Sequence, residues 1–196
     1  MVPVRPVTMA LAEPAAIETE RLILQPVAEV HRTDLIAFLG DPAVMSVRKL
    51  GVLEASAASE VVDRMIAQWR THGYGMYAVI ERESGAFLGE CGLRAPEQGS
   101  IPELSYGLLT AARRKGYARE AATAAVRFGF GPLGHSRLVA FARGDNLVSR
   151  HLLESPRLRS RGRAPQERLQ RCPIRGAGGG GMLTIALAPC GSVGQI

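Results

Sequence analysis

The sequence predicts one α/β domain with a mixed β-sheet. Apolar and polar residues alternate over residues 103–108, as in a strand with one buried face. Small apolar residues then recur at helical spacing over 118–129, and residues 137–142 form a nearly continuous apolar run, typical of a strand buried on both faces. A strand, a helix and a strand in this order predict a right-handed parallel crossover.

Three further strands are predicted upstream of this crossover. Residues 20–25 form the first strand, which ends at Pro26. Residues 74–82 and 86–94 form two antiparallel strands joined by a turn that contains Gly85. Together with the crossover, these strands give a sheet with both parallel and antiparallel pairs.

Two helices are predicted between the first strand and the next two. Residues 34–39 form a short helix, and a longer helix capped by Ser56 or Ser59 ends at Trp69. Trp69 lacks basic or aromatic companions, so it is expected to pack in the core rather than to stack on a base. Residues 44–52 form either a lid over a site or an ordinary surface loop.

A basic turn separates the central strand from the central helix. Its glycine permits a tight turn and close approach of a ligand to the backbone. Unpaired N–H groups and the positive end of the helix dipole converge there, which favours binding of a pyrophosphate. A solvated basic turn is the alternative. The residues concerned are Arg113, Arg114, Lys115, Gly116, Tyr117 and Ala118.

This turn and four other segments resemble one known family. The pattern R-x-x-G-x-A at the turn follows E-L-S-Y-G-L in the strand, and three more motifs are T-E-R-L-I-L-Q-P at 19–26, F-L-G-E-C-G-L at 87–93 and N-L-V-S at 146–149. Together they resemble the GNAT N-acetyltransferases, in particular the RimJ/RimL type that acetylates ribosomal-protein N-termini. The resemblance covers about residues 17–154.

The resemblance implies the GNAT fold and transfer of an acetyl group from acetyl-CoA to a primary amine, on a protein N-terminus or a small molecule. The family's crossover strands splay apart around the pantetheine arm, which implies backbone contacts at Leu108 and Leu109. Glu103 matches the family's glutamate base, although a surface carboxylate paired with an arginine is an equal alternative. Ser149 matches a group near the cofactor sulfur. Asn146 matches a cofactor contact, although helix capping alone also explains it.

Charge and composition argue against several other classes of protein. Residues 1–154 contain 17 basic and 17 acidic side chains, so the net charge of +6 arises in residues 155–196. Nucleic-acid binding through Arg157–Arg175 is the least favoured function, because neither aromatic residues nor a helical stripe accompany those arginines. The three cysteines and four histidines lack metal-binding spacing. No apolar run approaches the roughly 20 residues that cross a membrane, so a cytoplasmic protein without a metal is expected.

The chain departs from the family after Glu154. Residues 155–196 are rich in Arg, Gly and Pro without periodicity, which is typical of a disordered tail. A frameshift near Ser155 explains this better, because removal of one base there permits Ser-Arg-Gly-Phe, the continuation expected in the family. The domain is then expected to span 17–154, after a flexible arm over 1–16 that lacks the apolar region of a signal peptide.

The altered tail has a structural consequence. The sheet is expected to lack its usual last two strands, unless the apolar run 182–188 supplies one by accident. An incomplete sheet leaves open a second function, that of an inactive remnant which at most binds acyl-CoA.

Overall fold

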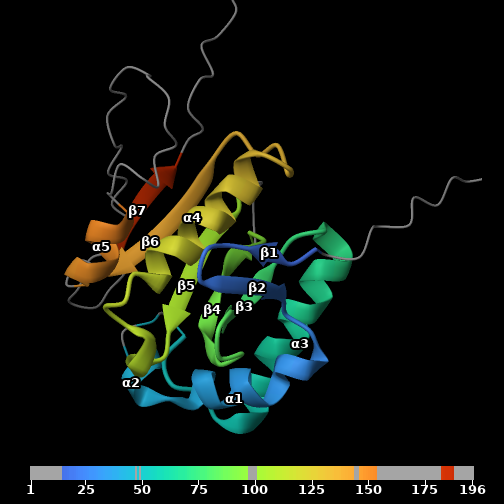
Figure 1. Ribbon diagram of the computed structural model, residues 1–196, viewed down its shortest axis with the longest axis vertical. Helices are drawn as coiled ribbons and strands as arrows, with labels where there is room; N and C mark the ends of the chain where they lie inside the picture. The colour runs from blue at the N-terminus through green and yellow to red at the C-terminus, as the bar shows by residue number, and fades with distance from the viewer. Residues whose placement is uncertain are drawn as a thin grey trace, which may run out of the picture.

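One parallel pair of strands lies within an otherwise antiparallel sheet. The computed structural model describes residues 15–46, 48, 50–96, 101–143, 146–153 and 182–187. The described strands form a seven-stranded sheet in chain order, and only β5 and β6 run parallel (Figure 1). The strands are β1 (Ile17–Glu18), β2 (Leu22–Pro26), β3 (Met76–Glu81), β4 (Phe87–Arg94), β5 (Glu103–Leu108), β6 (Leu138–Arg143) and β7 (Met182–Leu187). The mixed sheet predicted from the sequence is confirmed.

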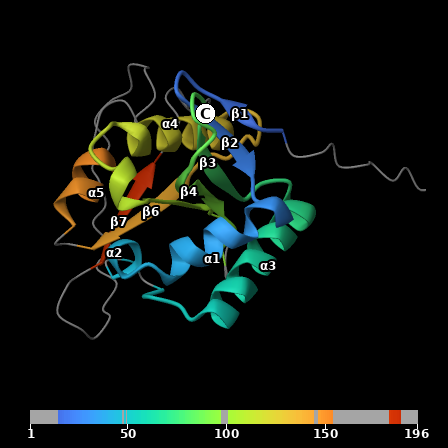
Figure 2. The same ribbon diagram turned by 60° about the horizontal axis from the view of Figure 1, so that its bottom comes forward.

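Helices cover both faces of this sheet. Figure 2 shows α1 and α3 on one side and α4 on the other. None of the helices in the described ranges is long and apolar enough to cross a membrane. The α-helices are α1 (Arg32–Gly40), α2 (Pro42–Met45), α3 (Ala55–His72), α4 (Tyr117–Phe130) and α5 (Leu147–Leu153), with short 3₁₀ helices at Glu29–His31 and Thr110–Ala112.

The long helix α3 differs from its prediction at the first turn. Glu54, not Ser56 or Ser59, occupies the N-cap position, and its side chain makes no capping hydrogen bond. Both serines lie inside the helix, because the helical pattern extends further upstream than the serines indicated. Trp69 is 5% exposed and donates through Nε1 to the Met76 carbonyl at 2.8 Å, which confirms its place in the core.

The small residues of α4 allow it to lie close to the sheet. Ala121, Ala122 and Ala125 of this helix are fully buried on the side that faces the sheet. A Cβ added at Gly129 would lie 2.9 Å from Leu93 Cδ1, so a larger residue here would force the Leu93 side chain to shift. The resulting position of α4 fixes where its N-terminus lies relative to β5.

The last strand comes from the apolar run near the C-terminus. β7 pairs antiparallel with β6 over six residues, from Leu138↔Leu187 to Arg143↔Met182. The sheet therefore gains one strand after β6, from the apolar run 182–188 that was the one exception to the expected loss of both strands. An exposed edge of β6 offers unpaired N–H and C=O groups, and the sequence M-L-T-I-A-L is suited to pair with them. Residues 1–14 of the arm predicted over 1–16 lie outside the described residues, as do residues 155–181 and 188–196 of the tail predicted over 155–196.

Candidate active site

The strands of the parallel crossover pair only at one end. β5 and β6 are in register at Glu103↔Val139 and Leu104↔Ala140, and no further pairs join them. Leu109 donates its N–H to the Leu88 carbonyl at 2.9 Å, on the β4 side. Since pairing alternates along an antiparallel strand, the N–H and C=O of Leu108 point to the opposite edge, toward β6. Of the two predicted backbone contacts, Leu108 therefore faces the opening and Leu109 does not.

The basic turn lies beyond this end of β5 and leads into α4. Arg114 has a φ of 64° and Gly116 a φ of 86°, so two left-handed residues reverse the chain before the helix. The N-cap is Gly116, which has no capping side chain, and helical hydrogen bonding begins at the N–H of Arg119. The N–H groups at Tyr117 and Ala118 therefore precede the first helical bonds and suit an anionic ligand.

The cationic side chains of the turn have different surroundings. Arg113 donates through Nε to the Leu108 carbonyl at 3.1 Å and through Nη2 to the Ala43 carbonyl at 2.8 Å. It braces the end of β5 against α2. Arg114 and Lys115 are exposed beside the helix N-terminus. These two residues are thus the cations that an anion at the turn would meet.

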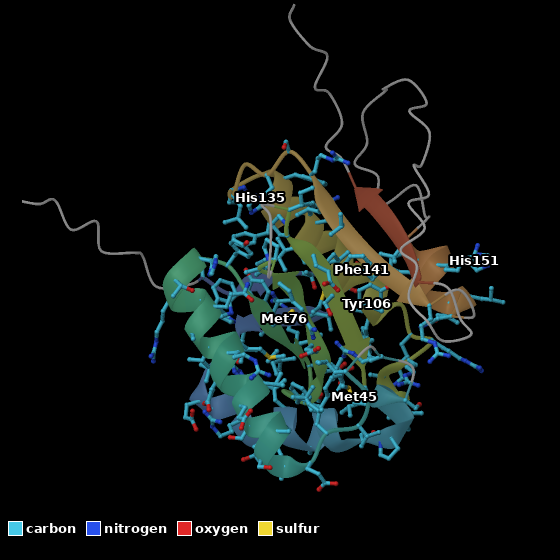
Figure 3. All side chains as sticks on the ribbon, turned by 180° about the vertical axis from the view of Figure 1, so that it is seen from behind. Met45, Met76, Tyr106, His135, Phe141 and His151 are labelled. Carbon is cyan, nitrogen blue, oxygen red and sulfur yellow. The ribbon has the colours of Figure 1, made fainter. Side chains whose placement is uncertain are left out.

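A tyrosine and a serine meet between β5 and α5. Tyr106 on β5 and Phe141 on β6 lie on the two strands that border the opening (Figure 3). The Tyr106 hydroxyl lies 2.7 Å from Ser149 Oγ, and Ser149 donates its N–H to Asn146 Oδ1 at 3.0 Å. Asn146 thus caps α5, and its role toward a cofactor stays a prediction. Burial raises the pKa of Tyr106 to about 12, so its hydroxyl is protonated at neutral pH.

The other face of β5 carries Glu103, Ser105 and Gly107. The predicted alternation is confirmed, since Leu104 and Leu108 are buried against α4 in the main core cluster. The polar face is turned the opposite way, toward α1 and the segment after α2. Glu103 is half-buried there, at the paired end of β5.

A buried ion pair lies next to this polar face. Glu90 on β4 is fully buried, and its Oε1 lies 2.5 Å from Arg48 Nη2 and 3.3 Å from Arg94 Nη2. Glu90 Oε2 and Arg48 Nη1 have no hydrogen-bond partner among the described residues. A Cβ on Gly107 would lie 2.2 Å from Arg48 Nη1, so the glycine makes room for this guanidinium. The segment 44–52, predicted as a lid or a loop, therefore places a charged side chain against β4 and β5.

Sequence reasoning missed three of these residues. Tyr106 was assigned to the apolar face of its strand, and only the fold brings its hydroxyl to Ser149. Glu90 gave one signal, a carboxylate in the otherwise apolar and glycine-rich run F-L-G-E-C-G-L. Arg48 lies in an irregular segment, where no pattern indicates its partner.

An open groove of about 1480 Å³ runs between residues 15–21 and the outer side of α4. Gly116 is among its lining residues, so it begins at the basic turn. Its charged lining residues are three arginines and three glutamates, namely Arg21, Arg119, Arg127, Glu18, Glu20 and Glu120. In the described part of the chain, no three His, Cys, Asp or Glu side chains gather in a way that would hold a metal ion.

Comparisons with known proteins agree with this geometry. The family model of the acetyltransferase (GNAT) domain matches residues 21–157. The uncharacterized protein YkkB of Bacillus subtilis strain 168 is 25% identical over 139 residues, which are 69% of this chain and 80% of that protein.

Two solved structures have the same fold at low sequence identity. RimL, a ribosomal L7/L12 α-N-protein acetyltransferase in complex with coenzyme A, superposes with a TM-score of 0.66 and 15% identity over 89% of this chain and 98% of its own. The spermidine N-acetyltransferase of Vibrio cholerae, in complex with CoA and spermine, has a TM-score of 0.65 and 13% identity over 87% and 96% of the two chains.

Proposed function

We propose, since the chain belongs to the GNAT acetyltransferase family, that it transfers the acetyl group of acetyl-CoA to a primary amine. Membership of the family implies acyl transfer from an acyl-CoA to an amine. The observation that best supports this proposal is the divergence of β5 from β6 next to the uncapped N-terminus of α4. Ligands of open α/β sheets gather beyond the carboxyl ends of the strands, which is the end that opens here.

The cofactor would be held mainly by backbone groups. The N–H groups of Gly116, Tyr117 and Ala118 suit the pyrophosphate, with the charges of Arg114 and Lys115 beside them. The edge of β5 at Leu108 would pair with the amide groups of the pantetheine arm, as a missing strand would. Asn146 and Ser149 at the start of α5 border the same opening.

Residues on both faces of β5 would then share the chemistry. Glu103, which lies at the paired end of β5, would take a proton from the acceptor ammonium directly or through water, which lets the nitrogen attack the thioester carbonyl. The N–H of Leu108 would stabilise the oxyanion. When the C–S bond breaks, the thiolate would take a proton from Ser149, and Tyr106, hydrogen-bonded to that serine and protonated at neutral pH, would replace it. The attacking nitrogen would release its second proton to solvent, from which Tyr106 would be protonated again.

Two classes of acceptor are proposed, namely a protein N-terminus and a small-molecule amine. The neighbour RimL is named for a protein substrate, and the Vibrio cholerae enzyme for spermidine. One fold thus serves both kinds of amine, because the scaffold does not determine the acceptor.

Thermal unfolding with and without acetyl-CoA tests the first half of the proposal. A ligand that binds only the folded state raises the melting temperature, so a rise with acetyl-CoA is expected. The second half is tested by following CoA release with spermidine and with peptides that begin with alanine or serine. A rise without any acetylation would favour the remnant that only binds acyl-CoA, and no rise would refute the proposal.

Glu103→Gln tests the role of the base. We expect kcat to fall about 100-fold, as for loss of a general base, while the melting shift with acetyl-CoA is unchanged. The matched control is Glu83→Gln, which changes an exposed carboxylate in the turn between β3 and β4 and should leave turnover unchanged. Equal turnover in both variants would remove Glu103 from the mechanism.

A further inference from the structure

Arg21, in the bend between β1 and β2, contacts the basic turn, which is almost a hundred residues further along the chain. Arg21 donates through Nε and Nη2 to Glu120 Oε2 at 2.9 and 2.7 Å, and through Nη1 to the Lys115 carbonyl at 3.0 Å. Its backbone N–H donates to Glu120 Oε1 at 2.8 Å, and Thr19 donates to the same oxygen at 2.6 Å. We call Arg21 and Glu120 the bracket.

Contacts with Glu120 and Tyr117 leave the Arg21 side chain little freedom to move. Its guanidinium lies over the Tyr117 ring, 4.7 Å from the centroid, and the Tyr117 hydroxyl donates in turn to Glu81. The hydrogen bond to Glu120 raises the pKa of Arg21, so the pair is charged across the range in which the protein would work. Because the Arg21 guanidinium is planar, its N–H donors fix the position of the Glu120 carboxylate relative to the Lys115 carbonyl.

This contact determines the direction of a neighbouring N–H group. The Lys115 carbonyl and the Gly116 N–H belong to the same peptide plane, and in a trans peptide they point in opposite directions. When Arg21 binds the carbonyl, the Gly116 N–H must point away from Arg21. Gly116 has a φ of 86° and no side chain, so the backbone around this peptide has little intrinsic preference without the bracket.

We propose that Arg21 and Glu120 are positioning residues for the pyrophosphate of acetyl-CoA, because they hold the Lys115–Gly116 peptide with its N–H turned toward the ligand. This inference rests on the proposed function. The charge of Arg21 is already matched by Glu120, so the arginine acts on the ligand through the peptide it orients. Loss of the bracket weakens contacts to the pyrophosphate and leaves contacts to the pantetheine arm unchanged.

Two acyl donors separate these effects. S-acetylpantetheine carries the thioester and the pantetheine arm but no pyrophosphate. For Arg21→Gln we expect the Kd for CoA and the KM for acetyl-CoA to rise about tenfold, with kcat within twofold of wild type. The kcat/KM for S-acetylpantetheine should not change. An equal loss with both donors would overturn the proposal, since it would indicate general distortion.

Arg82→Gln is the matched control. Arg82 has the same side-chain exposure as Arg21, 45%, and pairs with Glu18, but within the described residues its side chain makes no hydrogen bond or ion pair with the turn. Its variant should bind CoA like wild type, and a tenfold loss there as well would overturn the proposal. Glu120→Gln keeps the shape of the carboxylate and should give a smaller loss of CoA affinity of the same kind. It serves as the second variant if Arg21→Gln does not fold.

Binding and turnover are measured separately, so the two proposals can fail separately. If wild type binds CoA but acetylates no amine, the transfer reaction is refuted, while a tenfold rise in the Kd of Arg21→Gln still supports the bracket. If wild type binds CoA and Arg21→Gln binds it equally well, the bracket is refuted alone.

Discussion

The two edges of β5 are built in different ways. Toward β4, six consecutive residues pair in register, from Glu103↔Arg94 to Leu108↔Gly89. Toward β6, only Glu103 and Leu104 pair, and the strands then part. One strand is thus held rigidly along one edge and offers backbone groups along the other. A site that binds a ligand by backbone hydrogen bonds needs both, because the free groups must be fixed in place before the ligand arrives.

The two edges are also filled by different residues. At the paired edge, Gly89 has a φ of 146°, and a Cβ there would lie 2.2 Å from the Gly107 carbonyl oxygen. At the open edge, Tyr106 extends its hydroxyl to Ser149 on α5. Close pairing with β4 requires that Gly89 has no side chain. At the open edge, by contrast, the Tyr106 side chain reaches across to α5.

Gly89→Ala should have the largest effect, because it attacks the paired edge directly. The added methyl group meets backbone atoms of β5 and the φ suits only glycine, so we expect a loss of about 3 kcal/mol in the free energy of unfolding. Chemical denaturation measures it. The control is Gly134→Ala, at φ 65° with no atom within 4 Å of the added Cβ, for which about 1 kcal/mol is expected. Equal losses would mean that strain alone, and not close strand pairing, requires glycine at position 89.

Tyr106→Phe should have an intermediate effect, confined to the open edge. Loss of one hydrogen bond costs about 1 kcal/mol in stability. We expect kcat to fall about tenfold, because Ser149 loses the group that returns its proton. The control is Tyr77→Phe, since the Tyr77 hydroxyl is buried without a partner among the described residues and its removal should change neither property. Unchanged turnover in Tyr106→Phe would limit this tyrosine to packing.

The smallest effect is a pH dependence that is absent at neutral pH. Burial raises the pKa of Tyr106 from 10.0 to about 12, so the stability linked to its neutral form is complete below pH 10 and is lost as the pH rises toward 12. Urea unfolding of wild type and Tyr106→Phe between pH 8 and 11.5 tests this. The stability difference between them should be constant up to pH 10 and shrink above it. A constant difference throughout would show that Tyr106 titrates as it does in the unfolded chain.

The sequence by itself determined the elements around the site. The alternation over 103–108 predicted β5, the small residues over 118–129 predicted the buried face of α4, and Gly116 predicted the tight turn between them. These features were readable because the period of a strand or helix and the freedom of glycine are local properties of the chain. The same local patterns placed Leu108 and the turn next to each other.

Only the tertiary structure decided which side chains meet. Arg21 reaches Glu120, Arg48 reaches Glu90 and Tyr106 reaches Ser149 across separations of 99, 42 and 43 residues. The pairing of β7 with β6 is likewise set by a free edge far away in the sequence. Such contacts depend on strand register and on how helices lie across the sheet. The residues next to each other in the sequence do not reveal the strand register or the placement of the helices. For that reason nothing in the sequence indicated the bracket that orients Gly116.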